Sequence, residues 1–172
     1  MISIFQIDKS GNEIFEKDYS IALVKDREKV YGINIPQSAK DRVSHLFNSG
    51  ELNIESTSDK KAKSRLRIRF HTAIIILLIR KAIKDEGYVE DVNIQICNDI
   101  DGHFHEIRDM IFTNLSKLIP TLEKEDIVQT QFPKTSLVDI SAKNLRERNS
   151  KETKNYFLLS INLEELTNLI KK

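Results

Sequence analysis

The hydrophobic and polar positions in the first third of the chain predict three short strands. Residues 2–8 are almost continuously apolar, which is typical of a strand buried on both faces. Turn-forming residues follow at 9–12, and two β-rich stretches come next, at about 19–25 and 30–35, with a charged turn between them. Three consecutive strands joined by short turns predict an antiparallel meander.

The middle of the chain predicts a short helix and then the longest helix of the protein. Pro36 ends the third strand, and Ser38 is expected to cap a helix that runs to about Phe47. Residues 59–86 contain neither Gly nor Pro, and Gly87 follows them, so we expect one helix over this range. Its second half is apolar on all sides and must therefore be buried.

The rest of the chain alternates between strand and helix patterns. Strands are predicted at 92–97 and 127–132, helices at about 104–118 and 136–148, and an amphipathic helix at 156–170. Because parallel strands need helical crossovers, this order predicts an α/β fold with a mixed five-stranded sheet and helices on both faces. We expect a single domain over residues 1–172, with a C-terminal helical tail at about 153–172.

Composition is that of a globular protein with one domain. The chain has 172 residues, of which 40% are hydrophobic and 31% are charged, so it can bury a core without disulfides. The single Cys97 cannot form an internal disulfide and favours a reducing compartment, so we expect a cytoplasmic location. The longest apolar run, 73–79, is too short to span a membrane, and no secretory leader is indicated.

Four aspartates are candidates for a metal centre. Asp8 ends the first predicted strand, Asp99 and Asp101 follow the fourth, and Asp139 belongs to the helix after the fifth. Sites in open α/β sheets form beyond the carboxyl ends of strands, so these acids are expected to converge. Clustered carboxylates suit Mg²⁺ or Mn²⁺, and paired metals of this kind catalyse phosphodiester hydrolysis. The alternative is that the acids serve only turns and loops, where Asp is common.

Three short motifs in this order resemble the ribonuclease H-like superfamily, and the similarity covers most of residues 1–150. Residues 7–11 look like the first-strand motif of that superfamily. Residues 100–102 are similar to the fourth-strand motif of the type-two ribonucleases H, and residues 134–146 are similar to a late basic residue and the helix after it. The resemblance implies a ribonuclease H-like fold.

The same resemblance implies a nuclease that depends on Mg²⁺ or Mn²⁺. Its catalytic acids would be Asp8, Asp101 and Asp139, with Asp99 as a further metal ligand and Lys134 near the scissile phosphate. Two positions depart from the pattern: Lys9 stands where the superfamily has a second acid, and the long predicted helix has no acid before its last turn. A positive charge beside the first aspartate predicts weak or conditional activity.

Basic residues are concentrated on the first half of the long predicted helix. The formal net charge is only +1, but residues 60–84 contain many cations and no acid. Such a surface is expected to contact a phosphate backbone without reading its sequence. The candidate nucleic-acid contacts are Lys60, Lys61, Lys63, Arg65, Arg67, Arg69, Lys143 and Arg146. The alternative is an ordinary solvated helical face.

A His-x-His pair, His103 and His105, lies close to the acids after the fourth strand. Such a pair could bind zinc or another transition metal, and the alternative is two ordinary loop histidines. Three functions remain open: a nucleic-acid-binding nuclease, a non-catalytic interaction module on the same fold, and a metal-dependent hydrolase or nucleotide phosphatase that uses this pair. The sequence contains no Gly-rich phosphate loop or dinucleotide fingerprint.

Overall fold

An antiparallel meander forms the first half of the sheet, as the sequence predicts. The computed structural model describes residues 1–55, 58–87, 91–98 and 103–171. Strands β1 (Ile2–Ser10), β2 (Ser20–Lys25) and β3 (Lys29–Asn34) follow one another and pair antiparallel. All six residues of β2 are buried, because this strand lies between two others and is covered on both faces.

Three parallel pairings complete a mixed sheet with the order β5-β4-β1-β2-β3-β6. Strand β4 (Asp91–Cys97) lies beside β1, and β5 (Ile127–Thr130) lies beside β4. The sixth strand, β6 (Phe157–Leu158), pairs with β3. The prediction of a mixed sheet is confirmed, but the predicted number of five strands is wrong.

The extra strand lies in a segment whose sequence predicts a helix. Two residues are too few to show a strand period, and β6 is held by its neighbour, since the Phe157 ring stacks on the Tyr31 ring of β3 at a centroid distance of 5.0 Å. The C-terminal segment is helical again only from Leu163. Tertiary contact with the edge of the sheet therefore decides the conformation of this segment.

The bounds of the helices are α1 (Gln37–Asn48), α2 (Asp59–Glu86), α3 (Phe104–Leu115), the 3-10 turn η1 (Lys124–Asp126), α4 (Leu137–Arg146), α5 (Ser150–Thr153) and α6 (Leu163–Ile170). Helices α1 to α4 lie close to their predicted positions, whereas the last helix begins seven residues later than predicted and two short helical segments, α5 and η1, were not predicted. Ser38 does not cap α1, because Pro36 holds the N-cap position and no side chain bonds there. Helix α3 ends three residues earlier than predicted, at Leu115, and the chain continues in turns in which the Ile119 N–H donates to the Leu115 carbonyl at 2.8 Å.

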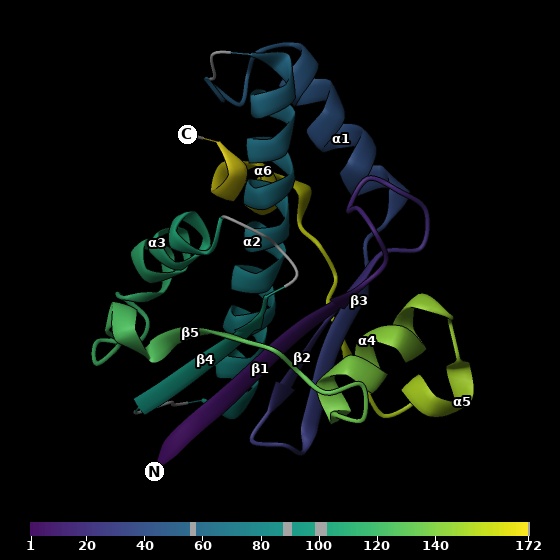
Figure 1. The fold of residues 1–172 in the computed structure, drawn as a ribbon, viewed down its shortest axis with the longest axis vertical. Helices are drawn as coiled ribbons and strands as arrows, with labels where there is room; N and C mark the ends of the chain where they lie inside the picture. Colours follow the sequence, from purple (N-terminus) through teal and green to yellow (C-terminus); the bar gives the residue numbers. More distant parts are fainter. Residues whose placement is uncertain (56–57, 88–90, 99–102, 172) are drawn as a thin grey trace.

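Helix α2 covers one face of the sheet. In Figure 1 it lies behind the strands, and its N-terminal half extends past them beside α1 and α6. Every residue from Phe70 to Ile79 is buried, and each large aliphatic side chain among them contributes about 1.5–3 kcal/mol by leaving water. The sheet, α3 and α6 supply the surrounding contacts. Among the described residues, no helix is long and apolar enough to cross a membrane.

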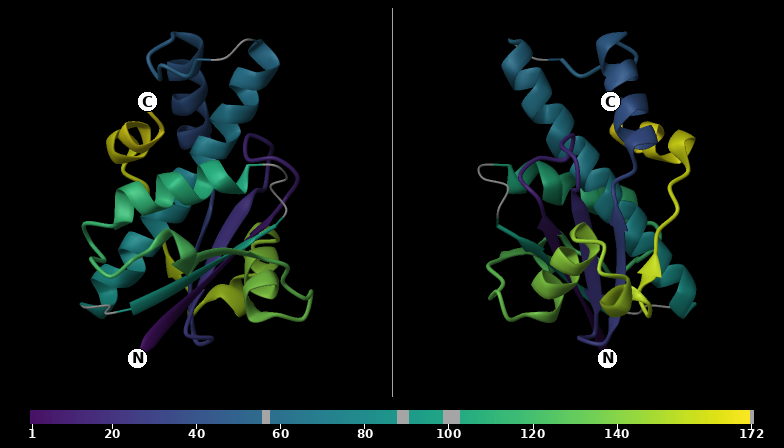
Figure 2. Two further views of the ribbon diagram at one scale, coloured as in Figure 1. Left: turned by 60° about the vertical axis from the view of Figure 1, so that its left-hand side comes forward. Right: turned by 90° about the vertical axis from the view of Figure 1, so that its right-hand side faces the viewer.

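Helix α4 covers the opposite face. The right-hand view in Figure 2 shows α2 and α4 on opposite sides of the strands. A second core cluster joins valines of β2 and β3 to Val138, Ala142 and Leu145 of α4. Gly32 of β3 permits this close approach, because a Cβ there would collide with the Leu145 side chain. The sheet thus carries helices on both faces, as predicted.

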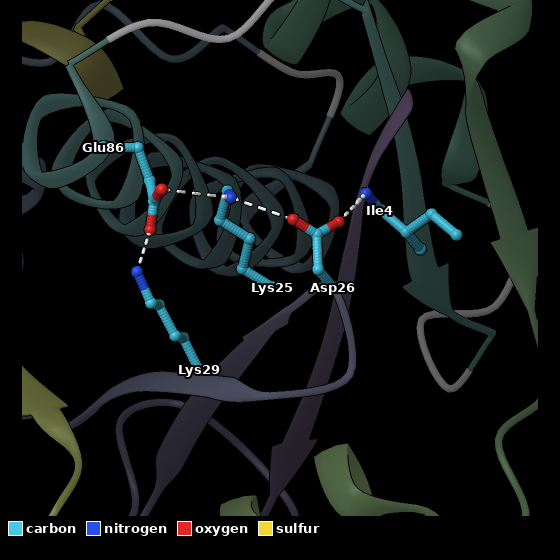
Figure 3. Close-up of polar contacts among 5 residues, drawn as sticks. All are labelled: Ile4, Lys25, Asp26, Lys29 and Glu86. Carbon is cyan, nitrogen blue, oxygen red and sulfur yellow. Dashed lines mark hydrogen bonds and ion pairs between the residues drawn. The ribbon is translucent and has the colours of Figure 1, made fainter. Parts of the chain in front are cut away.

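A chain of ion pairs joins the β2–β3 turn to the end of α2 (Figure 3). The buried Lys25 Nζ lies 2.9 Å from Asp26 Oδ2 and 3.6 Å from Glu86 Oε2, and Lys29 bonds to the same Glu86. Asp26 also accepts a hydrogen bond from the Ile4 backbone N–H at 2.8 Å. Burial acts to raise the pKa of Asp26, but the bonds from Ile4 and Lys25 hold that pKa below its ordinary value. The hydrogen bond from Lys29 lowers the pKa of Glu86.

Replacing Asp26→Ala is expected to lower the free energy of unfolding by about 1–3 kcal/mol, because it removes the acceptor of the Ile4 N–H and of the buried Lys25. Glu28→Ala in the same turn is the control and should change stability by less than about 0.5 kcal/mol. Urea denaturation measures both. Since the folded pKa values of Asp26 and Glu86 are lowered, their contribution is complete above about pH 5 and is lost as the pH falls through those values. Equal stability of the two variants would contradict this account.

Candidate functional site

The carboxyl ends of β1 and β4 lie side by side. The two strands are parallel neighbours, with Ile7 opposite Ile96, so Asp8 lies level with the last residue of β4. Asp8 is buried, and its Oδ1 accepts a hydrogen bond from the Lys9 backbone N–H at 2.8 Å. The expected neighbours of Asp8 in the metal site, Asp99 and Asp101, lie outside the described residues.

Helix α4 brings the late group of predicted site residues to the end of β1. Ser136 caps the helix by accepting from the Asp139 N–H at 3.3 Å, as the sequence predicts for this helix start. A groove of about 480 Å³ then forms between Ser10, two residues beyond Asp8, and the side chains of Lys134, Asp139, Ile140, Lys143, Asn144 and Glu147. This β1–α4 groove contains three of the predicted site residues.

Arg146 docks α4 onto the sheet. Its Nε donates to Ser10 Oγ at 2.8 Å. Two further bonds act in the same way: Asn34 Nδ2 donates to the Leu145 carbonyl at 2.6 Å, and Ser20 Oγ donates to the Ala142 carbonyl. Arg146, which the sequence suggests as a nucleic-acid contact, therefore holds α4 against β1 beside the groove.

Alternation along β1 sends Asp8 and Lys9 to opposite faces of the sheet. Ser10, which shares its face with Asp8, reaches α4. Lys9 lies on the α2 side, where its Nζ donates to the Gly11 carbonyl at 2.9 Å. The expectation that Lys9 opposes a metal at Asp8 rested on sequence adjacency, and the strand geometry weakens it.

Carboxylate oxygens such as those of Asp8 and Asp139 are the donors that Mg²⁺ and Mn²⁺ prefer. Among residues 1–55, 58–87, 91–98 and 103–171, no three His, Cys, Asp or Glu side chains are close enough to hold a metal ion. A metal site at this edge therefore needs an acid from the segment after β4.

A pocket of about 300 Å³ lies on the other face, at the same end of β1. Its lining comes from β1, the loop after β1, the middle of α2 and the residue before α3: Lys9, Asn12, Glu13, Ile14, Tyr19, Ser64, Arg67, Ile68, His71 and His103. Gly11 shapes the loop, since its φ is 118° and a Cβ there would lie 2.8 Å from the Tyr19 ring. We call this cavity the β1–α2 pocket.

His71 lies at the base of the β1–α2 pocket and is the functional candidate that sequence reasoning missed. Its side chain is buried, its ring packs edge-on against Tyr19 at a centroid distance of 6.1 Å, and neither ring nitrogen has a hydrogen-bond partner in the described structure. Burial, assisted by the charge of Lys9, lowers the pKa of His71 to about 3. The imidazole is therefore neutral. The signal in the sequence that could have found it is a histidine beside the apolar run of the long helix.

The basic residues of α2 do not form one surface. Helical geometry of about 100° per residue places Lys61, Arg65 and Arg69 on one side and Lys60, Lys63 and Arg67 on the other. The protein itself engages all three arginines: Arg65 donates to the Glu55 carbonyl at 2.9 Å, Arg67 pairs with Glu13 at 3.3 Å, and Arg69 donates to the Ile170 carbonyl at 2.7 Å. The three lysines are exposed.

The two histidines of the His-x-His pair have different surroundings. His103 lines the β1–α2 pocket at the N-terminus of α3. His105 is largely exposed and its Nε2 lies 3.3 Å from Asp109 Oδ2 on the same helix. The described geometry therefore gives no support to a metal held jointly by this pair.

Comparisons with known proteins give no relative of this chain: no family model, no curated protein and no solved structure matches it. The fold brings Lys134, Asp139 and Lys143 to the end of β1, and it leaves the basic half of α2 on a separate part of the surface.

The buried His71 should make the protein less stable in mild acid. Its folded pKa lies below the ordinary value, so between about pH 6.5 and pH 3 the unfolded chain binds a proton that the folded chain does not. At pH 5 this difference in proton binding lowers the free energy of unfolding by about 2 kcal/mol. Urea unfolding of the wild type and of His71→Leu between about pH 7 and pH 5 should show the extra loss only in the wild type.

The exposed His45 on α1 provides the control for this measurement. A His45→Leu variant should keep the full acid dependence of the wild type, because it leaves the buried His71 and its surroundings unchanged. Parallel stability curves for the wild type and His71→Leu would show that His71 is protonated in the folded protein.

Proposed function

We propose that this protein is a ribonuclease H-like domain that binds nucleic acid and hydrolyses phosphodiester bonds with Mg²⁺ or Mn²⁺. The observation that carries the proposal is the position of Asp8, a buried carboxylate at the carboxyl end of β1, beside the end of β4 and on the sheet face that α4 covers. The order of three strands, two helices, strand, helix, strand and helix supports the resemblance.

The acids of this site come from three elements. Asp8 lies on β1 and Asp139 on the first turn of α4, and the proposal adds Asp99 or Asp101 from the segment after β4. Divalent metal held by such carboxylates supplies an activated water and stabilises the leaving oxygen. The protein contributes the acids, their spacing, and Lys134 beside the phosphate that is cut.

Lys134 and Lys143 make the β1–α4 groove suitable for a phosphate backbone. Both are exposed residues that flank Asp139 in the groove. A carboxylate repels a polyanion, and cations on either side of it offset this repulsion by binding the phosphates. Such phosphate contacts do not depend on the nucleic-acid sequence. The exposed lysines at the start of α2 form a second, separate basic surface.

A non-catalytic nucleic-acid-binding module is the second candidate. Helix α2 has no acid between Asp59 and Asp85. The superfamily resemblance implies an acid in the middle of this helix, so its absence favours a domain that retains the binding surface and has lost hydrolysis.

The catalytic proposal predicts cleavage that depends on Asp8. Purified protein should cleave at least one of RNA, DNA or an RNA–DNA hybrid in Mn²⁺ or Mg²⁺, and EDTA should abolish the activity. Asp8→Asn and Asp139→Asn should each lower the rate by about 100-fold or more, because loss of one charged ligand weakens metal binding and charge stabilisation. Gel assays with labelled substrates measure the rates.

Asp41→Asn on the exposed surface of α1 is the matched control, since it removes one carboxylate charge away from the groove and should leave the rate unchanged. Circular dichroism of every variant verifies folding. If the wild type binds nucleic acid but cleaves none of the three substrates with either metal, the hydrolytic proposal fails and the binding module stands.

The groove lysines should control affinity for nucleic acid. The double variant Lys134→Gln and Lys143→Gln should bind more weakly, and the slope of log K against log salt should fall in magnitude by about two, one for each lost phosphate contact. The control is Lys151→Gln with Lys154→Gln, which removes the same charge from exposed positions outside the groove. Fluorescence anisotropy over a salt series compares them. Equal slopes for the two double variants would exclude the groove as the binding surface.

A further inference from the structure

The β1–α2 pocket lies where ligand sites form in open α/β sheets. In the sheet, β2 lies on one side of the central β1–β4 pair and β5 lies on the other. The connections after β1 and β4 therefore run in opposite directions, and ligand sites form at the carboxyl ends of two such strands. Lys9 from the end of β1 and His103 from the N-terminus of α3 both line the cavity. Its volume of about 300 Å³ is at the small end of the range for ligand pockets.

The polar lining of this pocket is rich in hydrogen-bond donors. Lys9 uses its Nζ on one contact, to the Gly11 carbonyl, so two of its three protons remain available. Arg67 uses Nε on Glu13 at 3.3 Å, which leaves the terminal nitrogens of its guanidinium. Among the described lining residues the single carboxylate is Glu13, which already accepts from Arg67 and from the Phe15 N–H at 2.9 Å. The lining therefore favours an anion.

His71 is an independent sign of a ligand. It is fully buried at the base of the pocket, and both of its ring nitrogens lack a partner among the described residues. A neutral imidazole has one donor and one acceptor, and buried polar groups are nearly always satisfied. The two nearby cations, Lys9 and Arg67, favour an anion as the missing partner, because an oxygen-rich anion can accept from the imidazole and from the cations together.

The rest of the lining is apolar. Ile14, Tyr19 and Ile68 provide hydrophobic wall around the donors. A bare inorganic ion would leave this wall without contact, and a carboxylate would be satisfied by the fork of one arginine. A tetrahedral phosphate can accept hydrogen bonds from donors that lie in several directions. An organic substituent on that phosphate would contact the apolar side chains as well.

We propose that the β1–α2 pocket binds a small organic phosphate monoester, with the phosphate held by Lys9 and Arg67 and with His71 hydrogen-bonded to the ligand. Free nucleotides and the phosphorylated end of a nucleic-acid strand share this chemistry. The pocket lies on the face of the sheet opposite the β1–α4 groove, so this binding does not depend on the metal-dependent hydrolysis proposed above.

Calorimetric titration of the full chain in EDTA tests the proposal. The probes are adenosine monophosphate, adenosine, inorganic phosphate, and one short oligonucleotide with and without a 5′ phosphate. Adenosine monophosphate or the phosphorylated oligonucleotide should bind, and each should bind at least tenfold more tightly than its counterpart without phosphate. Inorganic phosphate should bind more weakly than the monoester, because it does not contact the apolar wall.

Variants connect the binding to this pocket. Arg67→Gln should weaken monoester binding by about tenfold or more, as expected for loss of a charge-assisted hydrogen bond. Its matched control is Lys84→Gln, which removes the same charge from an exposed position at the other end of α2 and should bind like the wild type. His71→Leu should weaken binding several-fold, and the ring NMR signals of His71 in the wild type should shift when the ligand is added.

Each outcome decides the proposal. Binding of the free nucleotide identifies a metabolite-sized ligand, and binding of the phosphorylated oligonucleotide alone identifies a strand end; both support a monoester site. No binding of any probe, equal binding of adenosine and its monophosphate, or an unchanged affinity in Arg67→Gln overturns it. Because the titrations contain EDTA, failure here leaves the metal-dependent cleavage assay unaffected.

Discussion

The burial of the apolar half of α2 against the sheet is the interaction on which the rest of the structure depends. From Phe70 to Ile79 this helix has no polar side on which water could remain, so it must be enclosed by other elements. The sheet covers it on one side, and α3 and α6 cover it elsewhere. This enclosure fixes where the helix crosses the strands and so brings His71 to the carboxyl end of β1.

The alternation of side chains along β1 then separates two chemistries at one end of a strand. Asp8 belongs to the face under α4, beside a groove that is lined by two more carboxylates and by two exposed lysines. Lys9, the next residue, belongs to the face under α2, beside a neutral histidine and an arginine. The carboxylate of Asp8 and the ammonium group of Lys9 are thus adjacent in sequence but lie on opposite faces of the sheet, at two separate concave surfaces.

Much of the positive charge of α2 has a structural use. Arg69 satisfies carbonyl groups at the end of α6, which otherwise lack partners. Arg65 and Arg67 tie the helix to the segments before it in the chain. At the other end of the helix, Glu86 meets Lys25 and Lys29 of the β2–β3 hairpin. The basic residues of α2, which suggest nucleic-acid binding when the sequence is read alone, are thus partly engaged in contacts within the protein. Lys134 and Lys143 of the β1–α4 groove are the better candidates for phosphate contact.

The sequence by itself determined the elements with strong local signals: the first three strands, the bounds of α2, strand β4, and the Ser136 cap that precedes Asp139. It also named Asp8, Asp139 and the groove lysines, because strand-end acids and basic residues beside a helix start can be recognised locally. Only the tertiary structure decided the sixth strand, the split of the basic helix and the burial of His71. These features depend on contacts between residues far apart in the chain, and no local periodicity records which distant segment will cover a given side chain.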